Sequence, residues 1–228
     1  ITSKLFENRK GMGSLGNGNH FVTLYEVSDS SDKNYEEKTN FVLIHTGSRE
    51  YGREIFERNL KGSEYLINQS KALNYAKENR NNIGEMIEKL NSEKLEEVLE
   101  APHNYVESQN EKIIYRKGAI KLNSQEIGII PSSMGGDALI IKAKPEIIEL
   151  CNSFSHATGR KISRKEGKKE MFFLDGFPEE IYMPYFISPE NLNEELPPNY
   201  RTIEEILPQV ENYCEIIARL KPKSSIML

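Results

Sequence analysis

The sequence has few of the residues that would assign it to several common classes of protein. Its two cysteines, Cys151 and Cys214, lack the spacing of a metal-binding motif or of a disulfide framework, and they suit a reducing cytosol. No apolar run approaches the length of a membrane span. The net charge of −5 excludes a broad basic surface for nucleic acid, so any recognition of phosphate must be local.

The 228 residues are 37% hydrophobic and 29% charged, which is enough material for a sizeable core. We find no internal repeat or long linker, so a single domain over residues 1–228 is expected. The chain begins with Ile1 and soon reaches a glycine-rich motif at Gly11, as the later part of a longer protein would.

Composition and periodicity predict an α+β fold with antiparallel strands, in which most helices lie between His45 and His103. We expect strands at 21–27, 40–45, 113–120, 127–130 and 138–144. The predicted helices are a long helix from Ser63, a second helix over 92–99, a helix from Pro145 to about Asn152, a short helix carrying Arg160 and Arg164, and a C-terminal helix or helix pair over 202–220.

Residues 155–164 combine a histidine, small residues and cations. Arg160, Arg164 and Lys168 recur at a spacing of four after His156, which predicts one basic helical face. Backbone N–H groups at a helix start can bind anions, and an imidazole beside them can attack phosphorus. The alternative is an ordinary surface histidine next to a solvated basic face.

The histidines are few, and all lie at the boundaries of predicted elements: His20, His45, His103 and His156. Three imidazoles that met at one point would suit Mn, Zn or Fe, and the fourth would remain for covalent chemistry. Spacing in the sequence leaves open whether the four converge.

Seven motifs in one order resemble the RtcB family of GTP-dependent RNA ligases. They are GSLGNGNHF (13–21), HTGSR (45–49), NYAKENR (74–80), HNYVE (103–107), RKGA (116–119), PSSMG (131–135) and SHATGRKISR (155–164). The resemblance implies an enzyme that joins an RNA 3′-phosphate or 2′,3′-cyclic phosphate end to a 5′-hydroxyl end, in tRNA splicing or RNA repair.

The resemblance also implies cofactors, partners and residue roles. We expect Mn²⁺ and GTP, RNA as substrate, an activating helper protein, a cytoplasmic location, and a fold with helices packed around a central metal and nucleotide cleft. His156 would carry GMP as a phosphoramidate. The remaining roles are metal ligation by His20, His45 and His103, nucleotide binding by Asn19, Asn104, Ser133, Met134, Asp137, Ala157, Gly159 and Tyr200, and RNA-phosphate binding by Arg49, Arg160 and Arg164.

Several positions depart from the family pattern. The family's metal centre also uses an Asp-x-x-Cys motif upstream of the first histidine, and nothing before Gly11 supplies it. The other departures are Thr23 in place of a glutamate, Tyr115 in place of a histidine, Asp137 in place of a serine, and Met227-Leu228 in place of a final Lys-Gly. Two explanations compete: the missing metal ligands lie in an N-terminal part that precedes these 228 residues, or the chain is a divergent paralogue whose ligase activity is weakened or lost. The alternatives to a ligase are a silent protein that binds guanine nucleotide or RNA 3′-phosphate ends without ligating them, and a metal-dependent phosphoesterase that needs the three metal histidines but not His156.

Overall fold

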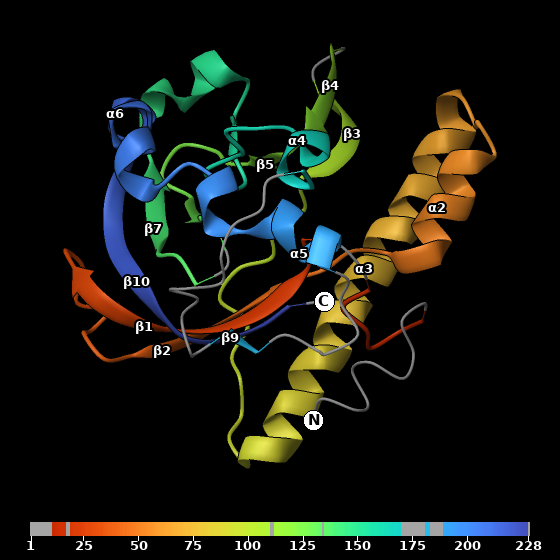
Figure 1. Cartoon of the computed structure of the whole chain (residues 1–228). Helices are drawn as coiled ribbons and strands as arrows, with labels where there is room; N and C mark the ends of the chain where they lie inside the picture. The colour runs from red at the N-terminus through yellow and green to blue at the C-terminus, as the bar shows by residue number, and fades with distance from the viewer. Residues whose placement is uncertain are drawn as a thin grey trace.

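The computed structural model describes residues 11–16, 19–109, 112–133, 135–169, 181–182 and 189–227 (Figure 1). Its strands are β1 (Phe21–Ser30), β2 (Asn40–His45), β3 (Asn104–Gln109), β4 (Lys112–Lys117), β5 (Ala119–Lys121), β6 (Ile127–Pro131), β7 (Ala138–Ala143), β8 (Ser153–Ser155), β9 (Ile181–Tyr182) and β10 (Cys214–Met227). Its helices are α2 (Arg49–Glu57), α3 (Gly62–Asn91), α4 (Arg164–Gly167), α5 (Pro189–Glu195) and α6 (Ile203–Tyr213), with 3₁₀ turns η1 (Pro145–Leu150) and η2 (Pro197–Asn199).

The main sheet has the strand order β2-β1-β10-β7-β6, and β9 adds a short parallel pairing to β10. The other pairings are antiparallel, including the separate β3–β4 hairpin and the β5–β8 pair. The sheet curls. Helix α3 runs along one side of the molecule, and α6 lies near the end of the sheet where β10 begins (Figure 1). The predicted α+β class, with antiparallel strands, is confirmed.

Apolar side chains of the strands pack against α3 and α6 in two separate core clusters. One core cluster joins Ile141 of β7 to Phe154 of β8 and to Ile203 and Val210 of α6. Another cluster joins Val22 of β1 to Ile83 of α3 and to Leu15 in the glycine-rich loop. Burying such side chains stabilises the fold by about 2 kcal/mol each. The second cluster fixes the loop that leads to His20.

The predicted second helix over 92–99 is wrong. Ser92 adopts the left-handed conformation (φ 57°) and ends α3, and the chain then runs back without regular secondary structure. Two ion pairs tie the returning segment to α3: Lys77 to Glu97 at 2.9 Å, and Arg80 to Glu100. The charges that resembled a solvated helix face therefore bind the neighbouring helix.

The expected C-terminal helix over 202–220 is correct only in its first half. Thr202 caps α6 through a capping box with Glu205, and the helix ends at Tyr213. From Cys214 the chain forms β10, which lies between β1 and β7 in the sheet. β-branched residues such as Ile216 and Ile217 suit a strand as well as a buried helix, so the periodicity alone was ambiguous.

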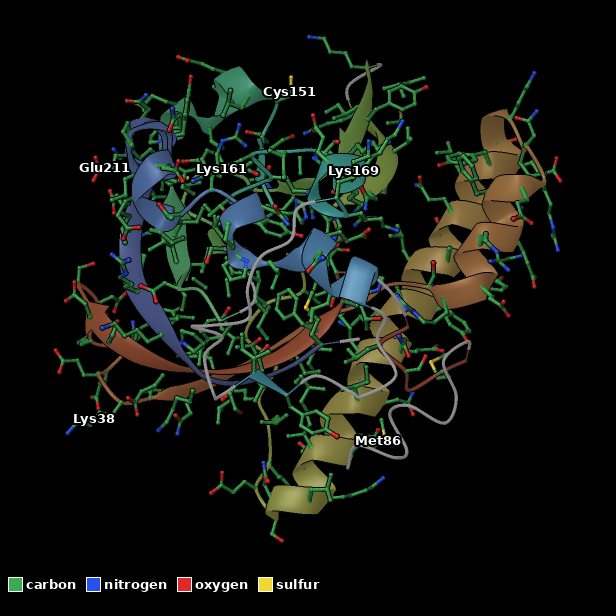
Figure 2. All side chains as sticks on the ribbon, viewed as in Figure 1. Lys38, Met86, Cys151, Lys161, Lys169 and Glu211 are labelled. Atoms are coloured by element: carbon green, nitrogen blue, oxygen red, sulfur yellow. The ribbon has the colours of Figure 1, made fainter. Side chains whose placement is uncertain are left out.

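Gly118 interrupts the strand predicted at 113–120, because its φ of +68° separates β4 from β5. The residues predicted as a helix from Pro145 form the 3₁₀ turn η1. Both cysteines are free, Cys214 buried and Cys151 exposed at the end of η1 (Figure 2). Among the described helices, none combines the length and the apolar character needed to cross a membrane.

Candidate functional site

Four imidazoles from four strand ends form one group, here named the imidazole cluster: His20, His45, His103 and His156. His45 ends β2 and pairs with Phe21, the first residue of β1, so the preceding residue His20 lies beside His45. The ring centroids lie 5.7 Å apart for His20 and His45, 5.2 Å for His45 and His103, 6.0 Å for His45 and His156, and 4.1 Å for His103 and His156. The fold thus brings together side chains that are far apart in the sequence.

Gly118 fixes the orientation of His156. The carbonyl oxygen of Gly118 accepts a hydrogen bond from the His156 backbone at 3.2 Å and lies 2.8 Å from the imidazole Nδ1. Since a carbonyl can only accept, Nδ1 carries the proton and Nε2 of the neutral ring keeps its lone pair. The φ of +68° at Gly118 lies in the left-handed region that favours glycine, whereas an added Cβ would make only an ordinary van der Waals contact with the His156 ring, at 3.5 Å.

Burial favours the neutral form of three of the imidazoles, those of His45, His103 and His156. Burial, reinforced by the three other histidines and by Arg80, holds the pKa of His45 well below its ordinary value. Burial and the neighbouring His156 lower the pKa of His103 to about 4. Burial also lowers the pKa of His156. Neutral imidazole is the form that attacks phosphorus or binds a metal.

Arg49 lies inside the glycine-rich loop, next to His20. Its Nη2 is 3.3 Å from both ring nitrogens of His20, its Nε donates to Gly47 O at 3.2 Å, and its Nη1 donates to Leu15 O. Burial lowers the pKa of Arg49 to about 10. A Cβ on Gly16 would lie 1.4 Å from Nη1, so only glycine leaves room for the guanidinium. Of the predicted phosphate-binding arginines, Arg49 therefore borders the imidazoles.

Two residues that sequence reasoning did not single out support this arrangement. The buried Asn79 accepts hydrogen bonds from Gly13 N at 2.6 Å and Ser14 N at 3.1 Å, and it donates to Gly47 O at 3.2 Å. Arg80 donates to Thr46 O at 2.6 Å, directly after His45. Both residues occur in the motif at 74–80, which carried the resemblance without an assigned role.

A second group of charged side chains surrounds Arg160, and we name it the arginine–carboxylate cluster: Arg160, Arg164, Glu194, Glu195 and Tyr200. Arg160 donates to the Tyr200 hydroxyl at 2.8 Å, and its guanidinium lies 4.7 Å from the centre of that ring. Arg164 Nε lies 3.8 Å from Glu195 and 3.9 Å from Glu194. Tyr200, predicted at the nucleotide, thus contacts Arg160, predicted at the RNA phosphate.

The predicted helical face of Arg160, Arg164 and Lys168 is wrong. The Ser163 capping box with Glu166 starts α4 at Arg164, and the helix ends after four residues. Arg160 lies before it, in an isolated β-bridge with Tyr200. A strong local cap therefore set the helix boundary inside the basic run.

The remaining predicted nucleotide residues fall in three places. Asn19 accepts a hydrogen bond from Arg164 at 3.2 Å, and Asn104 accepts one from Gly118 N at 3.0 Å. Asp137 accepts one from Arg219 Nε at 2.5 Å. Ala157 and Gly159 follow His156 in a loop, which is joined to the turn at 131–137 by a hydrogen bond from Thr158 N to Pro131 O at 3.0 Å. Ser133 is in that turn, and Met134 lies outside the described residues.

The imidazole cluster fits a transition metal in its donor chemistry. His103 Nδ1 is buried and finds no hydrogen-bond partner in the part of the chain that the structure describes, as a metal ligand would. The rings of His20, His45 and His103 stack, however, and within the described ranges no group of three or more His, Cys, Asp or Glu side chains is arranged to hold a metal ion. The described residues therefore supply imidazole ligands for a metal, but no Asp, Glu or Cys side chain among them completes a set of ligands around it.

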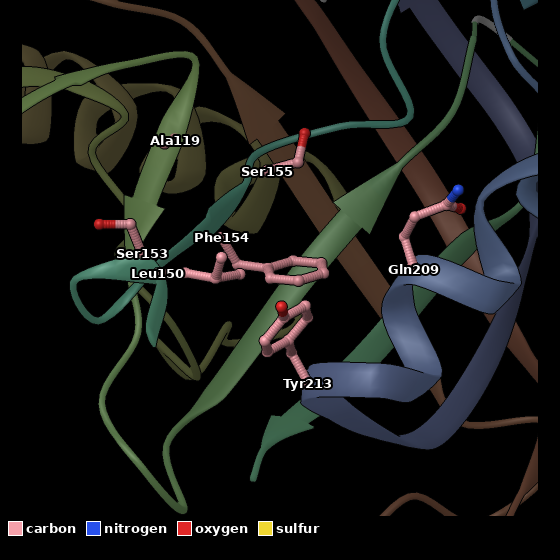
Figure 3. A pocket seen from close by; sticks show the side chains of 7 residues that line it. All are labelled: Ala119, Leu150, Ser153, Phe154, Ser155, Gln209 and Tyr213. Atoms are coloured by element: carbon pink, nitrogen blue, oxygen red, sulfur yellow. The ribbon is translucent and has the colours of Figure 1, made fainter. Parts of the chain in front are cut away.

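A cleft of about 1250 Å³ lies between the β2 side of the sheet and α3, and His45, His103 and His156 line it. A smaller pocket of about 380 Å³ lies between β8 and α6, lined largely by the apolar side chains of Leu150, Phe154 and Tyr213 (Figure 3). None of the predicted site residues lines the smaller pocket. The larger cleft is therefore the candidate site.

Neutral imidazoles in a cleft, with arginines nearby, are the groups of a protein that handles phosphate. The chain matches the family described as tRNA-splicing ligase RtcB over residues 2–64 and 57–227, and it belongs to that family.

Three relatives illustrate the match. The chain is 26% identical to the tRNA-splicing ligase RtcB of Nanoarchaeum equitans, with 94% of this chain and 59% of that protein covered. It is also 26% identical to the RNA-splicing ligase RtcB of Escherichia coli K12, with 94% and 60% covered. RNA-splicing ligase RtcB2 of another E. coli strain is 29% identical, with 70% and 48% covered. The chain thus spans about three fifths of the length of the first two relatives.

Proposed function

We propose that this chain carries the histidine nucleophile, the nucleotide site and the RNA-end site of a GTP-dependent RNA ligase. The ligase would join RNA 3′-phosphate or 2′,3′-cyclic phosphate ends to 5′-hydroxyl ends, in tRNA splicing or RNA repair. The single observation that carries the proposal is the imidazole cluster, in which His156 has its Nδ1 bonded to Gly118 O at 2.8 Å and a lowered pKa. The family membership of the chain supports the same chemistry.

The first step would be attack of His156 Nε2 on the α-phosphorus of GTP. A P–N bond forms, the bond between the α-phosphorus and the bridging oxygen breaks, and pyrophosphate leaves. Gly118 O stabilises the positive charge that develops on the ring, because it accepts the hydrogen bond from Nδ1 throughout. Covalent catalysis of this kind divides one difficult displacement into easier ones.

Two further displacements would complete the ligation. An oxygen of the RNA 3′-phosphate attacks the phosphorus of the guanylyl group, the P–N bond breaks, and the lone pair returns to Nε2. The 5′-hydroxyl then attacks the activated 3′-phosphate, GMP leaves, and the hydroxyl proton passes to solvent. Arg49 and Arg164, with Arg160, would hold the RNA phosphate, since guanidinium groups bind it through paired N–H donors.

Manganese bound by His20, His45 and His103 would neutralise charge on the phosphate oxygens. The orphaned His103 Nδ1 supports this role for the imidazoles. An activating helper protein and a cytoplasmic location belong to the same proposal, and the free cysteines agree with that location.

Guanylylation tests the proposal directly. We expect the protein to take up label from α-³²P-GTP in the presence of Mn²⁺ through an acid-labile bond, and His156→Ala to abolish the label. Ser155→Ala is a matched control, because the Ser155 side chain is exposed and, among the described residues, its hydroxyl bonds a main-chain oxygen alone, Ala157 O at 2.6 Å. A wild-type protein that binds GTP but stays unlabelled contradicts the ligase proposal.

The arrangement of the histidines favours a second candidate. Because the described residues form no closed metal site, the chain could bind guanine nucleotide or RNA 3′-phosphate ends without ligating them. This candidate predicts saturable binding of GTP, no label on His156, and an RNA-end affinity that falls in Arg164→Ala. The labelling experiment and a binding titration on the same sample therefore separate the two functions.

A further inference from the structure

The carboxylate of Glu195, at the end of α5, is one of the most enclosed charged groups among the described residues. Its side chain is 4% exposed. One oxygen, Oε2, accepts a hydrogen bond from the Tyr200 hydroxyl and lies 3.4 Å from Arg160 Nη1. The other oxygen, Oε1, has no hydrogen-bond partner among the residues that the structure describes, and it lies 3.8 Å from Arg164 Nε. A buried carboxylate is costly unless cations and donors compensate it, so its retention needs a reason.

The contacts of Glu195 complete the immobilisation of Arg160. All three nitrogens of Arg160 are engaged, because Nε donates to Ile162 O at 3.1 Å, Nη1 to the Tyr200 hydroxyl and Nη2 to Glu194 O. Its guanidinium also stacks over the Tyr200 ring. The plane of the guanidinium is therefore fixed before any ligand binds.

The backbone couples the same residues to the segment that follows His156. Lys161 N donates to Asn199 O at 2.7 Å, and Arg201 N donates to Gly159 O at 2.9 Å. These two bonds form the bridge between Arg160 and Tyr200. A shift of Tyr200 would therefore be transmitted to residues three to four positions from His156.

We propose that Glu195 is a positioning residue that fixes the Tyr200 ring for the guanine base and, through the same contacts, the Arg160 guanidinium for the RNA phosphate. This inference rests on the function proposed above and adds a residue that the motif comparison did not assign. Glu195 acts through other groups, because its own oxygens are used by Tyr200 and the arginines. The gain is preorganisation: side chains held in the bound geometry lose less entropy on binding.

Nucleotide affinity is the first test. We expect Glu195→Ala to weaken binding of GTP by roughly tenfold, equivalent to about 1.4 kcal/mol, and Glu195→Gln to restore part of the loss because its amide oxygen still accepts from Tyr200. Glu194→Ala is the comparison variant: it removes a neighbouring carboxylate that pairs with Arg164 and Lys168, but it keeps the main-chain oxygen that holds Arg160 and leaves the Tyr200 contact intact, so GTP affinity should stay near that of the wild type. Wild-type affinity in Glu195→Ala overturns the inference.

A double-mutant cycle shows whether Glu195 acts through the Tyr200 hydroxyl. Tyr200→Phe removes the hydroxyl and keeps the ring, so it should weaken GTP binding as Glu195→Ala does. The double variant Glu195→Ala, Tyr200→Phe should then be little weaker than either single variant. Fully additive losses would show that the carboxylate affects the nucleotide by another route, and they would overturn the inference.

The phenol of Tyr200 gives a readout that does not depend on nucleotide. Burial and the adjacent Glu195 raise the pKa of Tyr200, and Arg160 opposes this. The ultraviolet absorbance of ionised tyrosine is measured against pH, and the difference between wild type and Tyr200→Phe isolates the titration of this phenol. Glu195→Gln should lower the pH at the midpoint of that titration. An unchanged midpoint overturns the positioning role, whereas failure of GTP to bind the wild type overturns the proposed function.

Discussion

The imidazole cluster and the arginine–carboxylate cluster are both groups of partly buried titratable side chains, but they balance their charges in opposite ways. The groups that perturb His45 are three other histidines and Arg80, and each of them disfavours its charged form. Glu195, by contrast, has Arg160 and Arg164 beside it, and both favour its charged form against the effect of burial. The first cluster stays neutral, and the second keeps opposite charges in contact.

This difference separates two kinds of site. The arginine–carboxylate cluster uses most of its donors and acceptors on one another, with Glu195 Oε1 as an exception among the described residues, so its geometry is set without a ligand. The imidazole cluster leaves His103 Nδ1 unpartnered and the lone pair of His156 Nε2 unprotonated. Groups that lack internal partners are the ones that gain by binding an external one. We therefore assign chemistry to the imidazoles and positioning to the charged cluster.

Acid should act most strongly on the imidazole cluster. His103 has a pKa of about 4 when folded and an ordinary value of 6.5. Between these pH values the unfolded chain binds more protons, so the free energy of unfolding falls as the pH falls, by about 3 kcal/mol for His103 alone. His45 and His156 add to this in the same direction. Urea unfolding of chelator-treated protein between pH 7.5 and 4, in wild type and His103→Asn, measures the effect.

Glu195 should act with the opposite sign. Burial raises its pKa when folded, so above the ordinary value of 4.5 the folded state retains a proton that the unfolded chain has lost. Its contribution to stability is present at low pH and falls as the pH rises through the raised pKa. Glu195→Gln should remove this part of the pH dependence and leave the acid limb from the histidines. If His103→Asn and Glu195→Gln change the free energy of unfolding over the same pH range and in the same direction, the contrast between the clusters is wrong.

Removing Arg160 should cost more stability than removing a neutral imidazole. Arg160→Met leaves the buried Glu195 with Arg164 as its remaining neighbouring arginine, so we expect a loss of about 2–3 kcal/mol in the free energy of unfolding. His103→Asn at pH 8 should cost about 1 kcal/mol, because it strands no charge. Denaturant unfolding compares the two variants, and Arg160→Met in a Glu195→Gln background should recover part of its loss. Equal losses in both backgrounds would contradict the role of the stranded carboxylate.

The sequence predicted most strands and the positions of the histidines at strand ends, because alternating β-branched runs and the glycines that bound them are local signals. The start of the four-residue helix does have a local signal, the capping box of Ser163 and Glu166, and this signal outweighs the spacing of the cations. The sequence could not predict the contacts of Arg160 with Glu194 and Glu195, since these come from a distant segment. Likewise, Asn79 gains its role only when α3 packs on the glycine-rich loop. Such contacts between distant segments leave no periodic signal in the chain.

The glycine-rich loop offers the finest test, because Gly16 can be compared with another glycine of positive φ at which an added Cβ meets no neighbour. Gly16 and Gly62 both have positive φ, +82° and +56°, so alanine should cost about 1 kcal/mol at either position. At Gly62 an added Cβ meets nothing within 4 Å, whereas at Gly16 it would meet Arg49 Nη1 at 1.4 Å. We expect Gly16→Ala to cost about 1 kcal/mol more than Gly62→Ala, because Arg49 must leave Leu15 O. In an Arg49→Ala background this excess should disappear, and denaturant unfolding of the four variants measures it. A persistent excess would show that the backbone conformation, and not the guanidinium beside His20, requires glycine at this position.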